Sequence, residues 1–301
     1  KKKYKKTFIG GNLGEPLCNS FIDKVKYTHH VIELSSFQLE TIKNFEPKIS
    51  ILLNLSKDHL DRYVNIKNYI SAKKNILNKK NNINIISLDD KYSKRIFNNQ
   101  KIKNKISFSI KKINADVYFK DGYIVDNFFY KNKSIKLPII SMNLNAPYNM
   151  QSILVAYIVC KYFNIPIIYL KKTIKNFKGL PFRSSVIYNS KTKLIINNSK
   201  ATNISSALST LENKKNIFLI LGGVAKEDGF ERFTKFHKEI KKIYVYGKSR
   251  FIINSQVNLF KITSINKNLK EVVNIIWNDL SVIKNKVTII FAPACASFDQ
   301  L

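Results

Sequence analysis

The feature that most constrains the fold is a strand-like run that ends in a carboxylate. Residues 31–33 read VIE, and two serines and a helix-like apolar pattern follow as far as Glu40. In open α/β sheets ligands collect at the carboxyl ends of strands, so a glutamate such as Glu33 can hold a metal over a substrate there. The alternative is a plain strand followed by a serine-capped helix, with an incidental acid.

A second strand-like run ends in groups of the same kind. Residues 49–56 read ISILLNLS, which predicts a buried strand, and the charged segment KDHLDRY follows at 57–63. His59 lies in that segment between two acids. Glu33 and His59 therefore mark two strand ends that are suited to a hard cation or a phosphate.

The chain is strongly basic, but its charge is spread along the sequence. The 52 Lys and Arg residues outnumber 20 Asp and Glu, which gives a formal net charge of +32 over 301 residues. Lysine occurs together with abundant Asn and Ile, as in a biased coding composition, so the charge is a weak indicator of function. No stacking motif or basic helix is present. We therefore expect no nucleic-acid partner, although an anionic substrate such as a nucleotide is favoured.

Cysteine usage and hydropathy bear on the compartment. The three cysteines have no metal-ligand spacing, and a sparse, odd set is typical of a reducing compartment. No apolar run approaches the length of a membrane span. The chain starts without Met and stops abruptly at Leu301. We expect a cytoplasmic protein, with no membrane partner, that is truncated at both ends.

The first half of the chain alternates between strand and helix patterns. Residues 7–14 predict a strand running into a glycine turn with Asn12 at its tip, and residues 65–77 a helix. Further strand patterns lie at 83–88, 106–109, 117–119, 123–125 and 128–130, and helix patterns at 152–163 and 168–177. The short strands from 106 to 130 predict a small antiparallel insertion. Pro181 follows the last helix, and we place a domain boundary there, between 1–180 and 181–301.

The second half again alternates in a Rossmann-like order. Residues 186–196 predict a hairpin, and residues 203–211 a helix capped by Thr202 or Asn203. Strand patterns follow at 217–221, 243–246 and 287–291, with a helix at 269–280. The whole sequence therefore predicts an α/β protein of two domains.

A phosphate loop of the form GxxxxGK[S/T] is absent. The segment Gly247-Lys248-Ser249 is a partial match, but the first glycine of the motif would fall at Lys242. We interpret this partial match as chance.

Five short motifs, in order along nearly the whole chain, resemble the Mur ligases. They read GGNLG at 10–14, ELSSFQLE at 33–40, DHLDRY at 58–63, NSKATN at 198–203 and PACASFDQ at 293–300. The resemblance implies a central ATPase-type domain with a mostly parallel sheet and a small antiparallel insertion, plus a Rossmann-like C-terminal domain. It also implies that the phosphate loop and the domain gripping the uridine head group lie upstream of Gly10.

The resemblance implies an ATP-dependent amide-bond ligase of peptidoglycan biosynthesis. It would add D-glutamate to UDP-N-acetylmuramoyl-L-alanine through an acyl phosphate, as a monomer that uses ATP and Mg²⁺. Glu33, His59 and a carbamylated Lys73 are the implied catalytic and metal-binding residues. The segment SFDQ at 297–300 resembles the members specific for D-glutamate.

The remaining site residues are carried over from the same resemblance. Asn12 and Ser35 would face the muramyl substrate, Lys200 and Thr202 would meet nucleotide and D-glutamate, and Lys226, Ser297 and Phe298 would form the D-glutamate pocket. Asn149 would lie near adenine, and Arg183, at the hinge, would contact phosphate and ribose. Asn198 would serve the nucleotide, at a position where the usual acid would accept hydrogen bonds from donors on the nucleotide or the hinge.

Several positions depart from the family pattern. Tyr148 and Phe182 stand where histidines are usual, Ser185 replaces a usual Glu, and Asn198 replaces an acid. These changes keep open the alternative that the chain is a catalytically inactive, truncated remnant of such a ligase.

Overall fold

The computed structural model describes residues 6–59, 62–77, 82–137, 144, 147–226, 228–257, 263–281, 283 and 285–297, with only the backbone described at residues 147, 148 and 263. The chain forms two compact units. Unit 1 contains Lys1–Lys57, Arg62–Ile139 and Met150–Asn176, and unit 2 contains Asp58–Asp61, Ile140–Asn149 and Phe177–Leu301. None of the helices in these described ranges is both long enough and apolar enough to span a bilayer.

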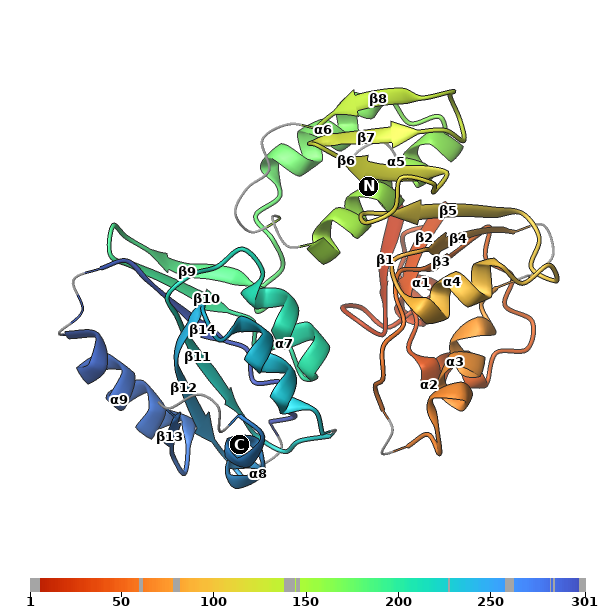
Figure 1. Cartoon of the computed structure of the whole chain (residues 1–301). Helices are drawn as coiled ribbons and strands as arrows, with labels where there is room; N and C mark the ends of the chain where they lie inside the picture. The colour runs from red at the N-terminus through yellow and green to blue at the C-terminus, as the bar shows by residue number, and fades with distance from the viewer. Residues whose placement is uncertain are drawn as a thin grey trace. The chain divides into compact units, whose positions relative to one another are not determined.

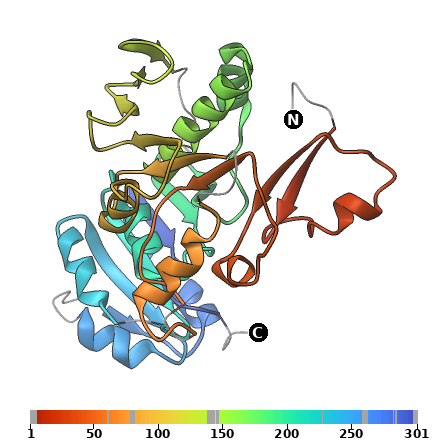
Figure 2. The ribbon, with the colours of Figure 1, turned by 90° about the vertical axis from the view of Figure 1, so that its right-hand side faces the viewer.

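Unit 1 contains a two-stranded and a six-stranded sheet (Figures 1 and 2). Strands β1 (Thr7–Gly11) and β2 (His29–Glu33) pair in parallel, with Gly11 opposite Glu33. The second sheet has the order β3 (Ile49–Leu52), β4 (Ile83–Ser87), β5 (Lys105–Ser109), β6 (Val117–Lys120), β7 (Tyr123–Asp126) and β8 (Lys133–Lys136). Strands β3 to β6 are parallel, and β6 to β8 are antiparallel. The predicted antiparallel insertion is therefore present, and it extends the edge of the main sheet.

The prediction of a strand at 128–130 is wrong, because these residues form a bend. The Asp126 carboxylate accepts hydrogen bonds from the backbone N–H groups of Phe128 (2.9 Å) and Phe129 (2.8 Å). Those donors are then turned toward Asp126, so the aromatic run bends, and the last strand of the sheet is β8.

The helices of unit 1 are α1 (Asn19–Ile22), α2 (Ser36–Glu40), α3 (Ile66–Lys74), α4 (Lys91–Phe97), α5 (Pro147–Tyr162) from Met150 onward, and α6 (Ile167–Asn176). Three of them begin at side chains that cap them. Ser35 and Gln38 form a capping box on α2, Asn65 caps α3, and Asp90 caps α4. The sequence interpretation missed α4, whose lysine-rich pattern hides its apolar face.

Unit 2 is built on one six-stranded sheet. Its order is β13 (Thr263–Ile265), β12 (Ile240–Tyr246), β11 (Ile217–Gly222), β14 (Val287–Phe291), β10 (Lys193–Asn197) and β9 (Ser185–Asn189). The strands β13, β12, β11, β14 and β10 are each parallel to their neighbours in this group, while β9 and β10 form the predicted antiparallel hairpin. The Rossmann-like pattern is thus confirmed.

Helices cover both faces of this sheet. The apolar residues of β11 alternate between two cores: Leu219 and Leu221 pack with α7 (Ile204–Leu211), the 3-10 helix η2 (Phe230–Phe236) and α8 (Arg250–Gln256), while Phe218 and Ile220 pack with α9 (Leu269–Ser281). Figure 1 shows α7 and α9 on opposite sides of the sheet. The strand order reverses after β13, when the chain returns through α9 to β14 between β11 and β10. Such a reversal opens a crevice at the carboxyl ends of the strands.

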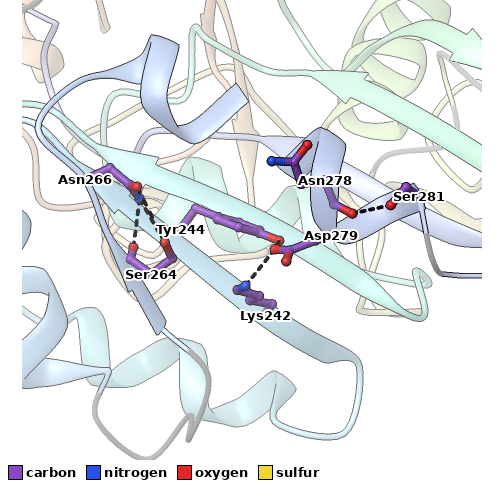
Figure 3. Close-up of polar contacts among 7 residues, drawn as sticks. All are labelled: Lys242, Tyr244, Ser264, Asn266, Asn278, Asp279 and Ser281. Carbon is purple, nitrogen blue, oxygen red and sulfur yellow. Dashed lines mark hydrogen bonds and ion pairs between the residues drawn. The ribbon is translucent and has the colours of Figure 1, made fainter. Parts of the chain in front are cut away.

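A polar contact fastens α9 to the sheet (Figure 3). Asp279 accepts hydrogen bonds from Lys242 Nζ (2.6 Å) and from the hydroxyl of Tyr244 (2.5 Å), both on β12. Burial raises the pKa of the Tyr244 phenol, and the neighbouring Asp279 carboxylate raises it further. The phenol therefore stays protonated and continues to donate to Asp279.

Candidate functional site

In unit 1 the ends of β1 and β2 bring Asn12 and Glu33 together. The backbone N–H of Asn12 donates to the carbonyl oxygen of Glu33 (2.8 Å), and its side-chain amide reaches a carboxylate oxygen of Glu33 (3.4 Å). Gly11 makes this approach possible: its φ is +113°, and a Cβ there would lie 2.3 Å from the Glu33 carbonyl oxygen. Both predicted side chains are exposed at this strand end.

Helix α3 directs Lys73 to the same place. Its Nζ lies 3.5 Å from the carbonyl oxygen of Leu34, the residue after Glu33, and 5.9 Å from the centre of the Tyr69 ring. A half-buried lysine that reaches the backbone just after a strand-end glutamate is placed differently from a solvated surface lysine. Ser35 starts α2, where its side chain exchanges hydrogen bonds with Gln38.

His59 belongs to the short segment Asp58–Asp61 that groups with unit 2. Its φ is +53°, in the left-handed region, and its backbone N–H donates to the Asp58 carboxylate (2.9 Å). Its Nε2 lies 3.8 Å from the other carboxylate oxygen of Asp58. The acid next to His59 thus orients both its backbone and its ring.

The carboxyl edge of the unit 2 sheet gathers four predicted residues. Lys200 and Thr202 follow β10, Lys226 follows β11, and Ser297 follows β14. Backbone hydrogen bonds tie the loops together: Ala294 N donates to Ala201 O (2.8 Å), and Val224 and Ala296 exchange N–H···O bonds of 2.8 and 3.0 Å. The topology therefore places two lysines and two hydroxyls in loops at one edge of the sheet, where an anionic ligand is favoured.

Gly223 permits the closest approach between these loops. Its φ is +120°, and a Cβ there would lie 2.2 Å from the carbonyl oxygen of Ala296. Any other residue would push the loop that carries Lys226 away from the loop that carries Ser297. The glycines before Lys226 therefore have a definite structural purpose.

Arg183 lies on a strained turn before β9. Its two neighbours, Phe182 (φ +62°) and Ser184 (φ +52°), are both in the left-handed region. The turn is held by Phe182 N donating to Ser185 Oγ (2.9 Å) and by Lys200 N donating to Phe182 O (3.2 Å). Arg183 and Lys200 are consequently presented by connected backbone segments.

Asn198, predicted to serve the nucleotide, makes its side-chain hydrogen bonds within unit 2. Asn198 is only 5% exposed. Its Oδ1 accepts from Ser184 N (3.2 Å), and its Nδ2 donates to Thr210 Oγ1 on α7 (2.6 Å). Both side-chain atoms are engaged inside unit 2, so Asn198 supports the Arg183 turn.

Other residues named from the sequence have the following places. Asn149 is half-buried in the first turn of α5. Phe298 lies outside the described residues, as do Asp299 and Gln300 of the same motif, and so does the Tyr148 side chain. Gly247 and Ser249 of the chance match to a phosphate loop are structural: Ser249 Oγ accepts from Ala225 N (2.9 Å).

The sequence interpretation missed a polar cluster at the carboxyl edge of the unit 1 sheet. Asp89, which follows β4, and Gln151 on α5 are joined by a 2.7 Å hydrogen bond. A repeated Asp-Asp directly after a strand was the available signal.

Without a chemical modification, the described side chains supply too few ligands to hold a metal ion. Over the described ranges, no three His, Cys, Asp or Glu side chains come together closely enough to hold a metal. The exposed Glu33 carboxylate, with Lys73 Nζ beside Leu34, suits a hard cation when a carbamate on Lys73 adds oxygen ligands.

Comparison with known proteins decides the family. The model of the Mur ligase middle domain matches residues 6–160. The chain belongs to the Mur ligase family. Among its Mur ligase relatives, the UDP-N-acetylmuramoylalanine–D-glutamate ligase of Rickettsia bellii is 33% identical over 97% of this chain and 65% of its own length. The ligase of the same name from Buchnera aphidicola is 33% identical over 100% of this chain and 67% of its own length.

Solved Mur ligases share the fold. MurF from Thermotoga maritima in complex with ADP superposes with a TM-score of 0.67 at 20% identity, over 96% of this chain and 70% of that one. MurF from Acinetobacter baumannii gives 0.66 at 15% identity, over 96% and 68%. The expected fold class and family are thereby confirmed. The chain spans 65% of the length of the Rickettsia relatives.

Proposed function

We propose that this chain is part of an ATP-dependent ligase that adds D-glutamate to UDP-N-acetylmuramoyl-L-alanine in peptidoglycan synthesis. The supporting observation is that relatives 33–34% identical over 97% of the chain are named for this reaction. The lysines and hydroxyls in the loops at the carboxyl edge of the unit 2 sheet suit an acidic amino acid.

In the proposed reaction the carboxylate of the muramyl substrate attacks the γ-phosphorus of ATP, and ADP leaves. The amine of D-glutamate then attacks the acyl phosphate, and inorganic phosphate leaves with formation of the amide. Lys226 and Ser297 bind the carboxylates of D-glutamate, and Lys200 and Thr202 orient its amine beside the nucleotide. Arg183 neutralises phosphate charge, and Asn149 contacts adenine.

Glu33, His59 and carbamylated Lys73 are the proposed ligands of Mg²⁺. When bound, Mg²⁺ screens the negative charge that gathers between phosphate and carboxylate. Asn12 lies against Glu33 and orients its carboxylate through the 3.4 Å contact. Asn12 and Ser35 are also the proposed contacts to the muramyl substrate, next to the phosphorylated carboxylate.

A second candidate is a folded remnant without turnover. Asn198 favours it, because an amide stands where the family has an acid. The buried hydrogen bonds of Asn198 argue against this second candidate, because they give the amide a structural role. A cytoplasmic location, a monomeric state and the lack of a nucleic-acid or membrane partner stay predictions.

Binding of D-glutamate tests the proposal on this chain. Saturation-transfer NMR is expected to show D-glutamate binding that L-glutamate does not match. Lys226→Ala should weaken it at least ~10-fold, since a charge-assisted contact is lost. Lys241→Ala, on an exposed position of β12, is the matched control. Equal binding of both enantiomers, unaffected by Lys226→Ala, would contradict the assignment of the pocket.

A further inference from the structure

Asp89 is the centre of a polar relay at the carboxyl edge of the unit 1 sheet. Its carboxylate accepts hydrogen bonds from the hydroxyl of Ser109 and from the backbone N–H groups of Ile110 (3.1 Å) and Lys111 (3.2 Å), all at the end of β5. It also accepts from Gln151 Nε2 (2.7 Å) on α5. Donors thus approach this carboxylate from two different elements.

Gln151 is held from both ends of its amide. While Nε2 donates to Asp89, Oε1 accepts from Asn54 Nδ2 (3.3 Å), after β3. The residue is 6% exposed. A carboxylate can only accept, so the direction of every hydrogen bond in the relay is set by the charge on Asp89.

The neighbouring acid secures the same edge. Asp90 accepts from Leu55 N (3.1 Å) in the segment after β3, and its other oxygen caps α4 through Tyr92 (2.9 Å) and Ser93 (2.8 Å). The pair Asp89 and Asp90 therefore joins the ends of β3, β4 and β5 to two helices.

We propose that Asp89 and Gln151 are positioning residues for the adenine end of the nucleotide site. Asn149 lies on α5 two residues before Gln151, within the same first turns of the helix. A residue that reads a base must be held within a fraction of an ångström, and the Asp89–Gln151 hydrogen bond fixes the start of α5 on the strand ends. This inference rests on the proposed function, because it takes Asn149 as the adenine contact.

Exchanging the acid and the amide tests the pair directly. Gln151→Glu sets two carboxylates about 2.7 Å apart, by the present hydrogen-bond length, and should weaken ADP binding ~10-fold or more. The double variant Asp89→Asn with Gln151→Glu restores one donor and one acceptor at the contact between positions 89 and 151: the amide introduced in place of Asp89 would donate to the new carboxylate, which still accepts from Asn54. The remaining oxygen at position 89 would still accept from Ser109, from Ile110 N (3.2 Å) and from Lys111 N. ADP affinity should then return to within ~3-fold of the unaltered chain, a rescue of Gln151→Glu that is expected when the two side chains interact directly.

The measurement is saturation-transfer NMR of ADP with the full chain, combined with hydrogen exchange of α5. Asp116→Asn is the matched control, because Asp116 accepts from Ser107 N and Oγ (both 2.7 Å) in the same sheet. It should leave ADP affinity unchanged. D-glutamate binding should be unchanged in every variant.

Three results would overturn the inference. In the first, Gln151→Glu loosens α5 in hydrogen exchange but leaves ADP affinity intact, so the pair is only structural. In the second, the double variant binds no better than Gln151→Glu. In the third, the unaltered chain gives no ADP signal at all, which would remove the proposed nucleotide site itself and is thereby distinguishable from the other two.

Discussion

Replacing Asn198 with alanine should release the turn that carries Arg183. The substitution removes the hydrogen bonds to Ser184 N and to Thr210 Oγ1. Two neutral hydrogen bonds at a site only 5% exposed correspond to roughly 2–3 kcal/mol of folding free energy, part of it from the donors left without partners. The left-handed backbone conformation costs about 1–2 kcal/mol at each of Phe182 and Ser184, and relief of this strain favours opening of the turn.

Trypsin cleavage after Arg183 measures this opening. If the free energy needed to open the turn falls by about 2 kcal/mol, the rate of cleavage after Arg183 should rise roughly 30-fold. Thr210→Val is the control, since it removes the anchor on α7 but leaves the Ser184 bond to Asn198. It should lower the melting temperature with a much smaller rise in cleavage at Arg183. Equal cleavage at Arg183 in the unaltered chain and in Asn198→Ala would refute the reasoning, whatever happens to the melting temperature.

Three further predictions follow from the structure. The isolated chain should not hydrolyse ATP with Mg²⁺, because it lacks a phosphate loop; sustained phosphate release in an enzymatic assay would contradict this. In a chimera with a relative, Lys73→Ala should abolish ligation and short carboxylates should partly restore it, whereas unaltered rates would make Lys73 a plain structural lysine. Burial acts to raise the pKa of Asp279, but hydrogen bonds from Lys242 and Tyr244 outweigh it and lower the pKa. The resulting stabilisation is complete above the unfolded pKa of about 3.9 and is lost as the pH falls through the folded pKa. In Asp279→Asn, the free energy of unfolding from urea titrations should therefore decrease less steeply as the pH is lowered.

The strand ends were predictable because apolar runs and the groups that follow them are adjacent in sequence. The run before Glu33 and the helix start at Ser35 needed only local patterns, and both were confirmed. The error at 128–130 has a local cause that composition does not show: Asp126 accepts hydrogen bonds from the N–H groups two and three residues later, and the aromatic residues then bend where a strand was expected.

The role of Asn198 depended on contacts that are distant in sequence. A polar residue in a ligand-binding motif suggests a ligand contact, but the burial of Asn198 follows from Thr210 on α7 and from the Arg183 turn. The relay through Asp89 and Gln151 was missed for the same reason, since the two residues are 62 positions apart. Sequence patterns identify which residues are polar, and only the fold decides what each one contacts.

The most direct test of the proposed function is ligation of radiolabelled D-glutamate by a chimera. In it, this chain replaces the region that it matches in the Rickettsia bellii relative, which supplies the remainder of that protein. Folding is checked first by a cooperative thermal transition. The account predicts ATP-dependent transfer of D-glutamate to UDP-N-acetylmuramoyl-L-alanine that is lost with Lys226→Ala and retained with Lys241→Ala. A folded chimera that binds D-glutamate and ATP but forms no labelled product would contradict it and favour the inactive remnant.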